Sequence, residues 1–319
     1  MPLHANLQPI IDASAMFPTP PDGLSVAELR EFAHKAMEQS FGLLSEAGPE
    51  VAAIVDHRVP VDGGEITVRT YRPEGSGPFP AHLYIHGGGF WLGTLDHFDA
   101  QCRWNATLAG CVVASVDYRL APEAKFPTPP EDCYTALRWL VDHAAELDVD
   151  AGRVSVGGAS AGGDLAAAVA LMARDRGGPR LVFQALEIPV TDLTMSQPSI
   201  DENGEGYVLT KNAIAQYTGY YLADPADATN PYASPLLADD LSGLPPALVF
   251  TAEYDPLRDE GEAYGRRLQD AGVQVLMRRW DGQFHGSQSM AAVIPAEAKE
   301  YREQLAAALR DAYAAIATS

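Results

Sequence analysis

Short apolar runs alternate along most of the chain with stretches in which apolar residues recur at helical spacing. Six of these runs are rich in Val, Ile, Leu and Phe, as expected for strands buried on both faces of a parallel sheet. They are AHLYI (81–85), CVVASVD (111–117), RVSVG (153–157), LVFQALEI (181–188), ALVFTAE (247–253) and VQVLMRRW (273–280). Helices are predicted between and after them, over 131–145, 163–175, 259–271 and 296–316. The alternation predicts an α/β fold, with helices packed on a mostly parallel sheet.

The N-terminal part of the chain carries a different pattern. Residues 25–47 have apolar positions at helical spacing, and Ser25 followed by Glu28 is typical of a capping box at a helix start. Two β-rich segments, AAIVDHRVPV and EITVRTYRP, then flank Asp62-Gly63-Gly64, which indicates a hairpin turn. We therefore expect a sheet of about eight strands, the first two of them antiparallel.

One long interval interrupts the alternation. Residues 189–245 are rich in Pro, Asp, Asn, Gly and Tyr, with one helix expected near 211–222. A connection of this length within a compact sheet usually forms a lid or an inserted subdomain. The interval is therefore predicted to lie outside the layered core.

Composition and charge narrow the classes of function. The chain has 319 residues, of which 47% are hydrophobic, so it can bury a large core. Its formal net charge of −21 argues against nucleic acid and anionic lipid as partners, because both are bound through Lys and Arg. The acidity indicates a soluble surface, with steering of a cationic substrate as the alternative.

The cysteines and the N-terminus bear on the compartment. Cys102, Cys111 and Cys133 form no C-x-x-C pair and are odd in number, so neither a disulfide framework nor a zinc site is expected. The first residues lack the basic and apolar regions of a secretory signal, and no run of about 18 apolar residues occurs. These features predict a cytoplasmic protein without a membrane-inserted segment.

The strongest signal for chemistry is Gly158-Ala159-Ser160-Ala161-Gly162, which matches the pattern G-x-S-x-G. A predicted strand precedes it and a helical stretch, GDLAAAVALMARD, follows, which is the setting of a nucleophile elbow. The sharp turn would strain Ser160 and project its hydroxyl above the sheet, close to the positive end of the helix. The alternative is a tight glycine turn that serves packing alone.

A second glycine-rich motif, HGGGF, occupies residues 86–90 directly after a predicted strand. Glycine N–H groups can converge on one point, as acyl transfer requires for the oxyanion of its tetrahedral intermediate, and the N–H of Ala161 can add to them. A phosphate cradle is the competing interpretation, but the chain contains no G-x-x-x-x-G-K-[ST]. His86 could act as a base, although a buried histidine that braces the loop is the favoured interpretation.

A serine hydroxyl needs a base, because it is a weak nucleophile at neutral pH. In proteins with a nucleophile elbow the order along the chain is Ser, acid, His, and His285 is the only one of the eight histidines that follows Ser160. It lies just past the strand predicted at 273–280, and the carboxyl ends of strands carry the ligand-binding groups of open α/β sheets. The alternative is a surface-loop histidine.

The acid of the site is expected at the end of the preceding strand. Three acids lie there, namely Glu253, Asp255 and Asp259. Asp255 is favoured because it falls in the turn, which Pro256 stiffens, and could hold the imidazole in one tautomer. Asp192 and Asp164 are less suitable, since one lies in the long interval and the other in the elbow helix.

These motifs together resemble the bacterial hormone-sensitive lipase family of carboxylesterases. The matching segments are HGGGF (86–90), DYRLAPEAKFPTPPED (117–132), GASAGG (158–163), AEYDPLRDEGEAY (252–264) and FHG (284–286), which span about 200 residues. The resemblance implies an α/β-hydrolase core made of 49–188 and 241–319. It also implies a helical cap made of 1–48 and 189–240, the segments outside the alternating pattern.

Residue by residue, the resemblance implies roles for two sets of groups. The nucleophile would be Ser160, the acid Asp255 and the base His285. The oxyanion donors would be the N–H groups of Gly88, Gly89 and Ala161. No metal and no organic cofactor is implied.

Other positions of the motifs are expected to support the site or to depart from the family. Asp117 and Arg119 would form an internal polar network. Ala159 stands where relatives often have Asp, and Ser287 stands where they often have an aromatic residue. Both departures can alter the pocket, so the substrate cannot be copied from relatives.

The sequence thus predicts a serine carboxylesterase that acts on small-molecule esters through an acyl-enzyme. Candidates for the pocket are Phe90, Trp91, Tyr217 and Tyr221, together with Met16, Phe17, Tyr207 and Tyr220. No long apolar lid is present, which favours short-chain or aryl esters over triglyceride. The alternatives are an amidase, a lactonase or a carbamate hydrolase with the same residues, and a non-catalytic small-molecule-binding protein. A homodimer is compatible with the resemblance, although no interface can be identified.

Overall fold

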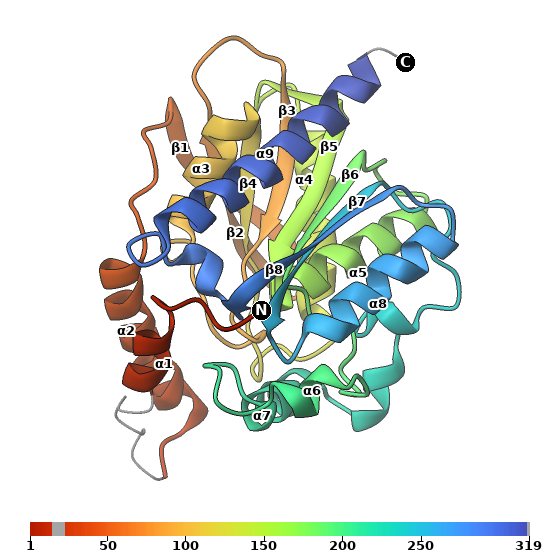
Figure 1. Cartoon of the computed structure of the whole chain (residues 1–319). Coiled ribbons are helices and arrows are strands. Elements are labelled where there is room, and N and C mark those ends of the chain that lie inside the picture. Colours follow the sequence, from red (N-terminus) through yellow and green to blue (C-terminus); the bar gives the residue numbers. More distant parts are fainter. Residues whose placement is uncertain (15–22, 318–319) are drawn as a thin grey trace.

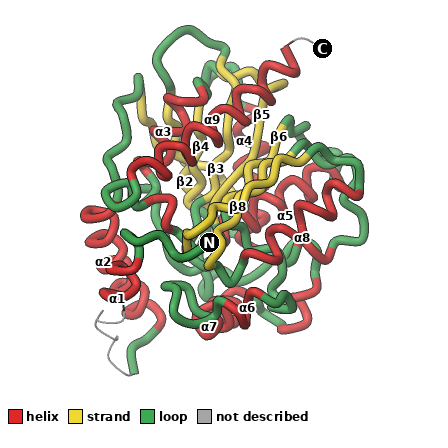
Figure 2. Tube along the Cα trace, in the orientation of Figure 1, coloured by secondary structure: helices red, strands yellow, loops and turns green. Residues whose placement is uncertain are grey.

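The hairpin segments and the six buried runs form one eight-stranded sheet in the computed structural model, which describes residues 1–14 and 23–317 (Figures 1 and 2). The strands are β1 (Ala53–Val61), β2 (Gly64–Arg72), β3 (Phe79–Ile85), β4 (Val112–Asp117), β5 (Val149–Ala159), β6 (Phe183–Glu187), β7 (Ala247–Tyr254) and β8 (Val275–Phe284). Their order is β1-β2-β4-β3-β5-β6-β7-β8. β1, β2 and β4 pair antiparallel and the remaining pairs are parallel, so the predicted α/β architecture and the antiparallel first pair are confirmed.

Helices cover both faces of this sheet. α3 (Asp99–Ala109) and α9 (Pro295–Ala317) pack on one face, where Figure 1 shows α9 crossing the strands. α4 (Thr128–Asp142), α5 (Ala161–Asp175) and α8 (Arg258–Asp270) pack on the other. Because side chains alternate between the faces along each strand, two hydrophobic cores result, and each lies between the sheet and one helix layer.

The predicted N-terminal helix is present as α2 (Val26–Leu44). Its N-cap Ser25 and the side chain of Glu28 form the predicted capping box. Three helices were not predicted, namely α1 (Gln8–Ser14), α3 and the four-residue α6 (Ser199–Glu202). α1 is short and lies beside a small cluster that includes Phe284, while α3 buries small groups such as Cys102. Tertiary packing, and not a strong local pattern, stabilises α1 and α3.

β8 is longer than the sequence pattern indicated. The strand was expected to end at Trp280, but it continues to Phe284 after a register shift against β7. Tyr254 and Phe284 pair at the end of the two strands. His285 therefore follows directly from a paired strand, which fixes its position more firmly than a free loop would.

The long interval after β6 lies beyond the carboxyl ends of the strands. It contains α6 (Ser199–Glu202), α7 (Lys211–Tyr221) and two 3₁₀ turns, Pro225–Thr229 and Pro235–Leu237. Figure 1 shows α6 and α7 below this edge of the sheet, with α1 and α2 to their left. This arrangement is compatible with a division into a cap (1–48 and 189–240) and a core, and the division stays a prediction.

Two further sequence expectations can be compared with the structure. All three cysteines are buried free thiols. Among the residues described, no helix has both the length and the apolar character that crossing a membrane would require.

Candidate active site

Ser160 lies at the sharp turn between β5 and α5. Its backbone has φ 57° and ψ −121°, a conformation that a residue with a side chain adopts at a cost. Neighbouring main chain holds it there: the Ser160 N–H donates to the Glu187 carbonyl at 2.9 Å, and the Ser160 carbonyl accepts from the Gly163 N–H at 2.9 Å. The turn places the hydroxyl at the N-terminus of α5, where the helix dipole favours negative charge.

The glycines of G-x-S-x-G are required by close packing around this turn. A Cβ on Gly158 would lie 2.3 Å from the Ile85 carbonyl oxygen, and one on Gly162 would lie 2.0 Å from the same atom. Any larger residue would push β3 away from the elbow. The tight strand–turn–helix geometry therefore requires glycine at both positions of the motif.

His285 and Asp255 meet Ser160 at this edge of the sheet. The His285 Nε2 lies 3.0 Å from the Ser160 Oγ, and its Nδ1 lies 2.7 Å from Asp255 Oδ2. Asp255 is only 1% exposed, and its other oxygen accepts from the Leu257 N–H at 2.8 Å. The three side chains follow β5, β7 and β8, so the sheet aligns hydroxyl, imidazole and carboxylate in hydrogen-bonding order.

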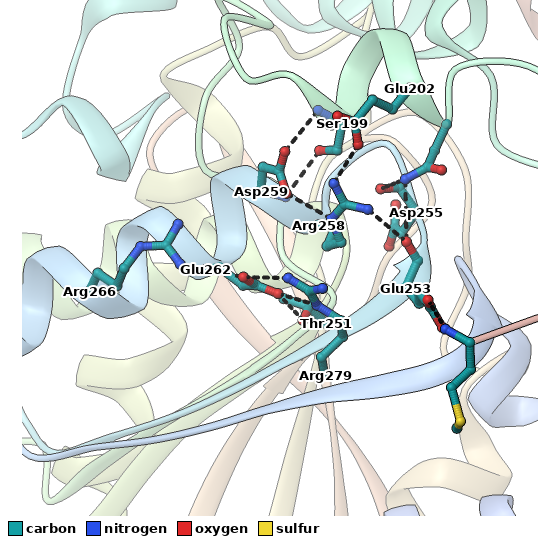
Figure 3. A network of polar contacts seen from close by, with 12 residues as sticks. Ser199, Glu202, Thr251, Glu253, Asp255, Arg258, Asp259, Glu262, Arg266 and Arg279 are labelled. Carbon is teal, nitrogen blue, oxygen red and sulfur yellow. Dashed lines mark hydrogen bonds and ion pairs between the residues drawn. The ribbon is translucent and has the colours of Figure 1, made fainter.

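The other candidate acids are engaged elsewhere. Glu253 binds the N-terminal ammonium group and the Gly282 N–H. Asp259 accepts from the Ser199 N–H at 3.0 Å and pairs with Arg258 at 2.7 Å. Figure 3 shows Arg258 between Glu202 and Asp259, with Asp255 in the adjacent turn. Of these acids, only Asp255 is bonded to His285, and the surrounding network ties its turn to α6.

The other two acids considered from the sequence also lie away from the imidazole. Asp192 accepts hydrogen bonds from Thr194 and Ser196 in its own loop. Asp164, in the first turn of α5, is fully buried, and neither of its carboxylate oxygens has a partner within the described chain. Burial, together with the nearby Glu260 carboxyl, holds the pKa of Asp164 well above its ordinary value.

This raised pKa makes stability depend on pH. The pKa of the Asp164 carboxyl is higher in the folded protein than in the unfolded chain, so this group does not lower stability at low pH. As the pH rises above about 4 toward the folded pKa, the group lowers stability progressively. We expect Asp164→Asn to raise the free energy of unfolding by on the order of 1 kcal/mol at pH 8, and by less at pH 5. Thermal unfolding at both pH values measures this. Asp270→Asn, on the exposed surface, is the charge-matched control, and an equal gain at both pH values for Asp164→Asn would contradict the account.

The loop after β3 lies over the serine. Gly88 and Gly89 have φ values of 119° and 58° and line the same cavity as Ser160. Among residues 1–14 and 23–317, no hydrogen bond of the loop backbone uses the N–H of Gly88, Gly89 or Ala161. The loop is instead closed through the Gly88 carbonyl, which accepts from the Leu92 N–H at 2.9 Å. These three N–H groups are therefore available to an oxyanion.

Gly89 gives a direct test of this loop. A Cβ at residue 89 would lie 2.5 Å from Cδ2 of Tyr217, so Gly89→Ala must displace the loop or the ring. We expect kcat for p-nitrophenyl butyrate to fall by about 100-fold or more, the usual effect of losing one oxyanion donor. The double variant Gly89→Ala/Tyr217→Ala removes the clash and should recover at least about tenfold. Equal rates for the two variants would show that the clash is not the cause.

His86 braces the glycine loop. It is fully buried and stacks on Tyr118, with ring centroids 4.4 Å apart. The Tyr118 hydroxyl donates to the His86 carbonyl at 3.1 Å. Burial lowers the pKa of His86 to about 4, so the ring is neutral at neutral pH. This agrees with the structural role expected for His86.

The polar network expected around Asp117 and Arg119 is only half present. Arg119 pairs with the buried Asp132 at 2.6 Å and also donates to it from its backbone N–H. Asp117 is exposed, so its expected place in an internal network is wrong. It is the last residue of β4 and pairs with Thr67 of β2.

α2 is fastened to the loop that follows the glycines. The Arg30 side chain donates to the carbonyl oxygens of Trp91 at 2.8 Å and Ala121 at 2.6 Å, and it pairs with Glu123. His34 accepts a hydrogen bond from the Gly93 N–H at 3.2 Å. The N-terminal segment thus forms one wall of the site. From the sequence, this segment was expected only to belong to a cap.

A cavity of about 1080 Å³ opens at Ser160 and His285. Of the predicted pocket residues, Phe90 and Tyr217 line it. Tyr221 is fully buried behind Phe90, with ring centroids 3.9 Å apart, and Trp91 packs against Tyr217 and Tyr220. Trp91 and Tyr221 therefore support the wall without lining it. Tyr207 packs on Tyr254 in another cluster, and Met16 and Phe17 lie outside the described residues.

The cavity also has walls that sequence reasoning missed. Leu193, Leu209, Ile214 and Leu257 are among its apolar lining residues, and Phe41, Phe98, Trp104 and Glu187 line it as well. The only signal available was Glu187, an acid inside the apolar run LVFQALEI. No group of three or more His, Cys, Asp or Glu side chains in the described chain is arranged to hold a metal ion. The expectation of a metal-free site stays a prediction.

Comparisons with known proteins bear on this arrangement. Residues 82–289 match the protein family described as alpha/beta hydrolase fold. The carboxylic ester hydrolase LipN of Mycobacterium tuberculosis is 46% identical over 246 residues, 75% of this chain and 65% of that protein. The ethyl acetate hydrolase of Pseudomonas putida is 40% identical over 270 residues, 82% of this chain and 84% of that protein. A hyperthermophilic esterase from the archaeon Pyrobaculum calidifontis has 42% identity and a TM-score of 0.92, covering 99% of this chain and all of that one.

Proposed function

Because this chain belongs to the hormone-sensitive lipase family of α/β hydrolases and is a carboxylesterase, we propose that it cleaves short-chain and aryl esters through Ser160. His285 acts as the base, and Asp255 orients it. The observation that supports these roles is the continuous hydrogen-bonded line from Ser160 Oγ through the imidazole to Asp255. Labelling with a fluorophosphonate, located on the chain by mass spectrometry, tests the assignment of the nucleophile.

The proposed reaction proceeds in two halves. His285 accepts the proton of Ser160 as the hydroxyl oxygen attacks the ester carbonyl, and Asp255 stabilises the imidazolium. The N–H groups of Gly88, Gly89 and Ala161 bind the oxyanion. His285 then protonates the departing alcohol, and water attacks the acyl group on the serine by the same route, releasing the acid.

The size and lining of the site support the proposed substrate class. The apolar wall of Leu193, Leu209 and Ile214 suits a hydrocarbon group, and a cavity of about 1080 Å³ suits a small molecule. The relative named ethyl acetate hydrolase acts on a short ester by its name, which favours the same class here. α2 and the segment 189–240 would cover the substrate as a cap.

The wider setting is proposed from the cysteines and the net charge. Three buried free thiols are compatible with a cytoplasmic location. The net charge of −21 argues against a nucleic-acid partner. A homodimer is compatible with the family, and measurement of the mass in solution tests it.

A substrate series separates the proposed function from its rivals. We expect kcat/KM for p-nitrophenyl acetate and butyrate to exceed that for the laurate ester by at least about tenfold. Anilides, lactones and carbamates of matched acyl size are expected to react at least about 100-fold more slowly than the esters. A faster amide, lactone or carbamate would replace the proposed function by that activity, and absence of turnover would favour a binding protein.

A further inference from the structure

A buried carboxyl lies beside the proposed nucleophile. Glu187 is the last residue of β6 and pairs in register with Ala159, and its carbonyl accepts from the Ser160 N–H at 2.9 Å. Glu187 and Ser160 line the same cavity. Because side chains alternate along a strand, Glu187 shares the face of Phe183 and Ala185, on the side of α3 and α9. Its side chain is therefore within reach of a molecule bound at Ser160.

One oxygen of this carboxyl lacks a protein partner. Oε1 of Glu187 has no hydrogen bond, and the side chain forms no ion pair, among the residues that the structure describes. Burial raises the pKa of Glu187 to about 7, even though the nearby Tyr301 hydroxyl acts to lower it. A buried carboxyl oxygen without a hydrogen bond is costly, because it loses its hydration without compensation. Its position on a cavity wall points to a partner supplied by a ligand.

The surroundings of Glu187 indicate which ligand chemistry fits. We define the Glu187 arm of the cavity as Phe41, Tyr84, Phe98, Trp104, Ala159 and Glu187, all of which line it. Aromatic faces attract cations, and a carboxylate completes such a site. Ala159 leaves room there, because its side chain ends at Cβ. A protonated amine matches both the aromatic walls and the acid.

The charges around the cavity favour the same chemistry. Six acidic side chains line it against two guanidinium groups, and of the six only Glu38 and Glu187 form no ion pair among the described residues. Both guanidinium groups are engaged, because Arg302 pairs with Glu46 at 2.9 Å and Arg103 pairs with Asp99 at 2.7 Å. Arg302 also covers the Trp104 ring at 4.4 Å. The net negative lining raises the local concentration of cations and leaves Glu187 free to bind one.

We propose that the Glu187 arm binds a protonated amine carried by the substrate, so that this carboxylesterase selects amino-substituted esters. The inference rests on the proposed function, because the amine must belong to the ester that Ser160 attacks. The ammonium N–H donates to Glu187, and the aromatic walls exclude water from the pair. Glu187 is thus a specificity-determining residue that takes no part in bond making.

Matched ester pairs test this selection, because each pair differs only in a protonated nitrogen. One pair is 2-(dimethylamino)ethyl acetate and 3-methylbutyl acetate, with the amine on the alcohol side. The other is ethyl 4-(dimethylamino)butanoate and ethyl 5-methylhexanoate, with the amine on the acyl side. At neutral pH we expect the amine ester of at least one pair to exceed its hydrocarbon counterpart by about tenfold in kcat/KM, mainly through KM. Glu187→Gln should reduce that ratio by at least about tenfold.

Controls separate this inference from general damage and from the proposed function. Glu65→Gln makes the same charge change on the β1–β2 hairpin and should keep the wild-type ratio. Glu187→Leu repeats the test if the amide variant is unstable, and the hydrocarbon ester reports on the fold in each variant. A ratio near one in both wild-type pairs, or a ratio that survives both substitutions, overturns the inference while ester hydrolysis stands. Absence of Ser160-dependent hydrolysis of p-nitrophenyl acetate would instead overturn the proposed function.

Discussion

Ser160→Ala is expected to lower kcat for p-nitrophenyl butyrate by about 10⁴- to 10⁶-fold. The Ser160 hydroxyl lies 3.0 Å from His285 Nε2, and no acyl-enzyme can form without it. Residual hydrolysis would come from the oxyanion donors acting on bound water. Steady-state kinetics, with circular dichroism as the check on folding, measures the effect.

The control for this variant is a serine outside the site. Ser242 is exposed and its hydroxyl binds Asp240 at 3.0 Å, so Ser242→Ala should retain activity within about twofold. A folded Ser160→Ala protein that kept a tenth or more of wild-type kcat would exclude Ser160 as the nucleophile.

Asp255→Asn is expected to lower kcat by about 10²- to 10⁴-fold. The carboxylate accepts the Nδ1–H of His285 at 2.7 Å and so leaves Nε2 free to take the serine proton. An amide in its place can donate to Nδ1 and favour the other tautomer, in which Nε2 carries the hydrogen. Kinetics across a pH range measures the loss, which should appear in kcat more than in KM.

The neighbouring acid provides a matched control. Glu253 lies two residues earlier and binds the N-terminus and the Gly282 N–H, away from the imidazole. Glu253→Gln should therefore change kcat by less than about fivefold. A large loss of kcat for Glu253→Gln, together with a small loss for Asp255→Asn, would show that Asp255 is not the acid.

Most of the sheet could be predicted because its strands carry a strong local signal. The run CVVASVD is short and rich in β-branched residues. It forms β4, which starts one residue later than predicted. The capping box of Ser25 and Glu28 located α2 for a similar reason, since both side chains bond within one turn. Elements whose stability comes from local chemistry were therefore found.

Elements stabilised by distant contacts were missed. α3 has no side-chain cap, and its buried groups are mostly small, such as Cys102 and Ala106. The extension of β8 depends on pairing of Phe284 with Tyr254 across the sheet. The packing of α3 and the pairing at the end of β8 involve residues distant along the chain, and neither produces a periodic pattern in the sequence. The pattern therefore missed α3 and ended β8 too early.

The candidate site divides in the same way. Gly158 and Gly162 could be recognised because the elbow leaves no room for a side chain. The pocket could not, because its walls come from α2, α3 and β6, which are far apart along the chain. Tyr221 looked suitable by residue type, yet it stacks behind Phe90, and only the packing reveals this.

The central claim is that Ser160 is the one residue acylated during turnover. Reaction with a fluorophosphonate, followed by intact-mass and peptide mass spectrometry, tests it most directly. The account predicts one adduct per chain, on the peptide that contains Ser160, with labelling slowed by p-nitrophenyl butyrate and lost in Ser160→Ala. An adduct on another residue, or an active enzyme that remains unlabelled, would contradict it.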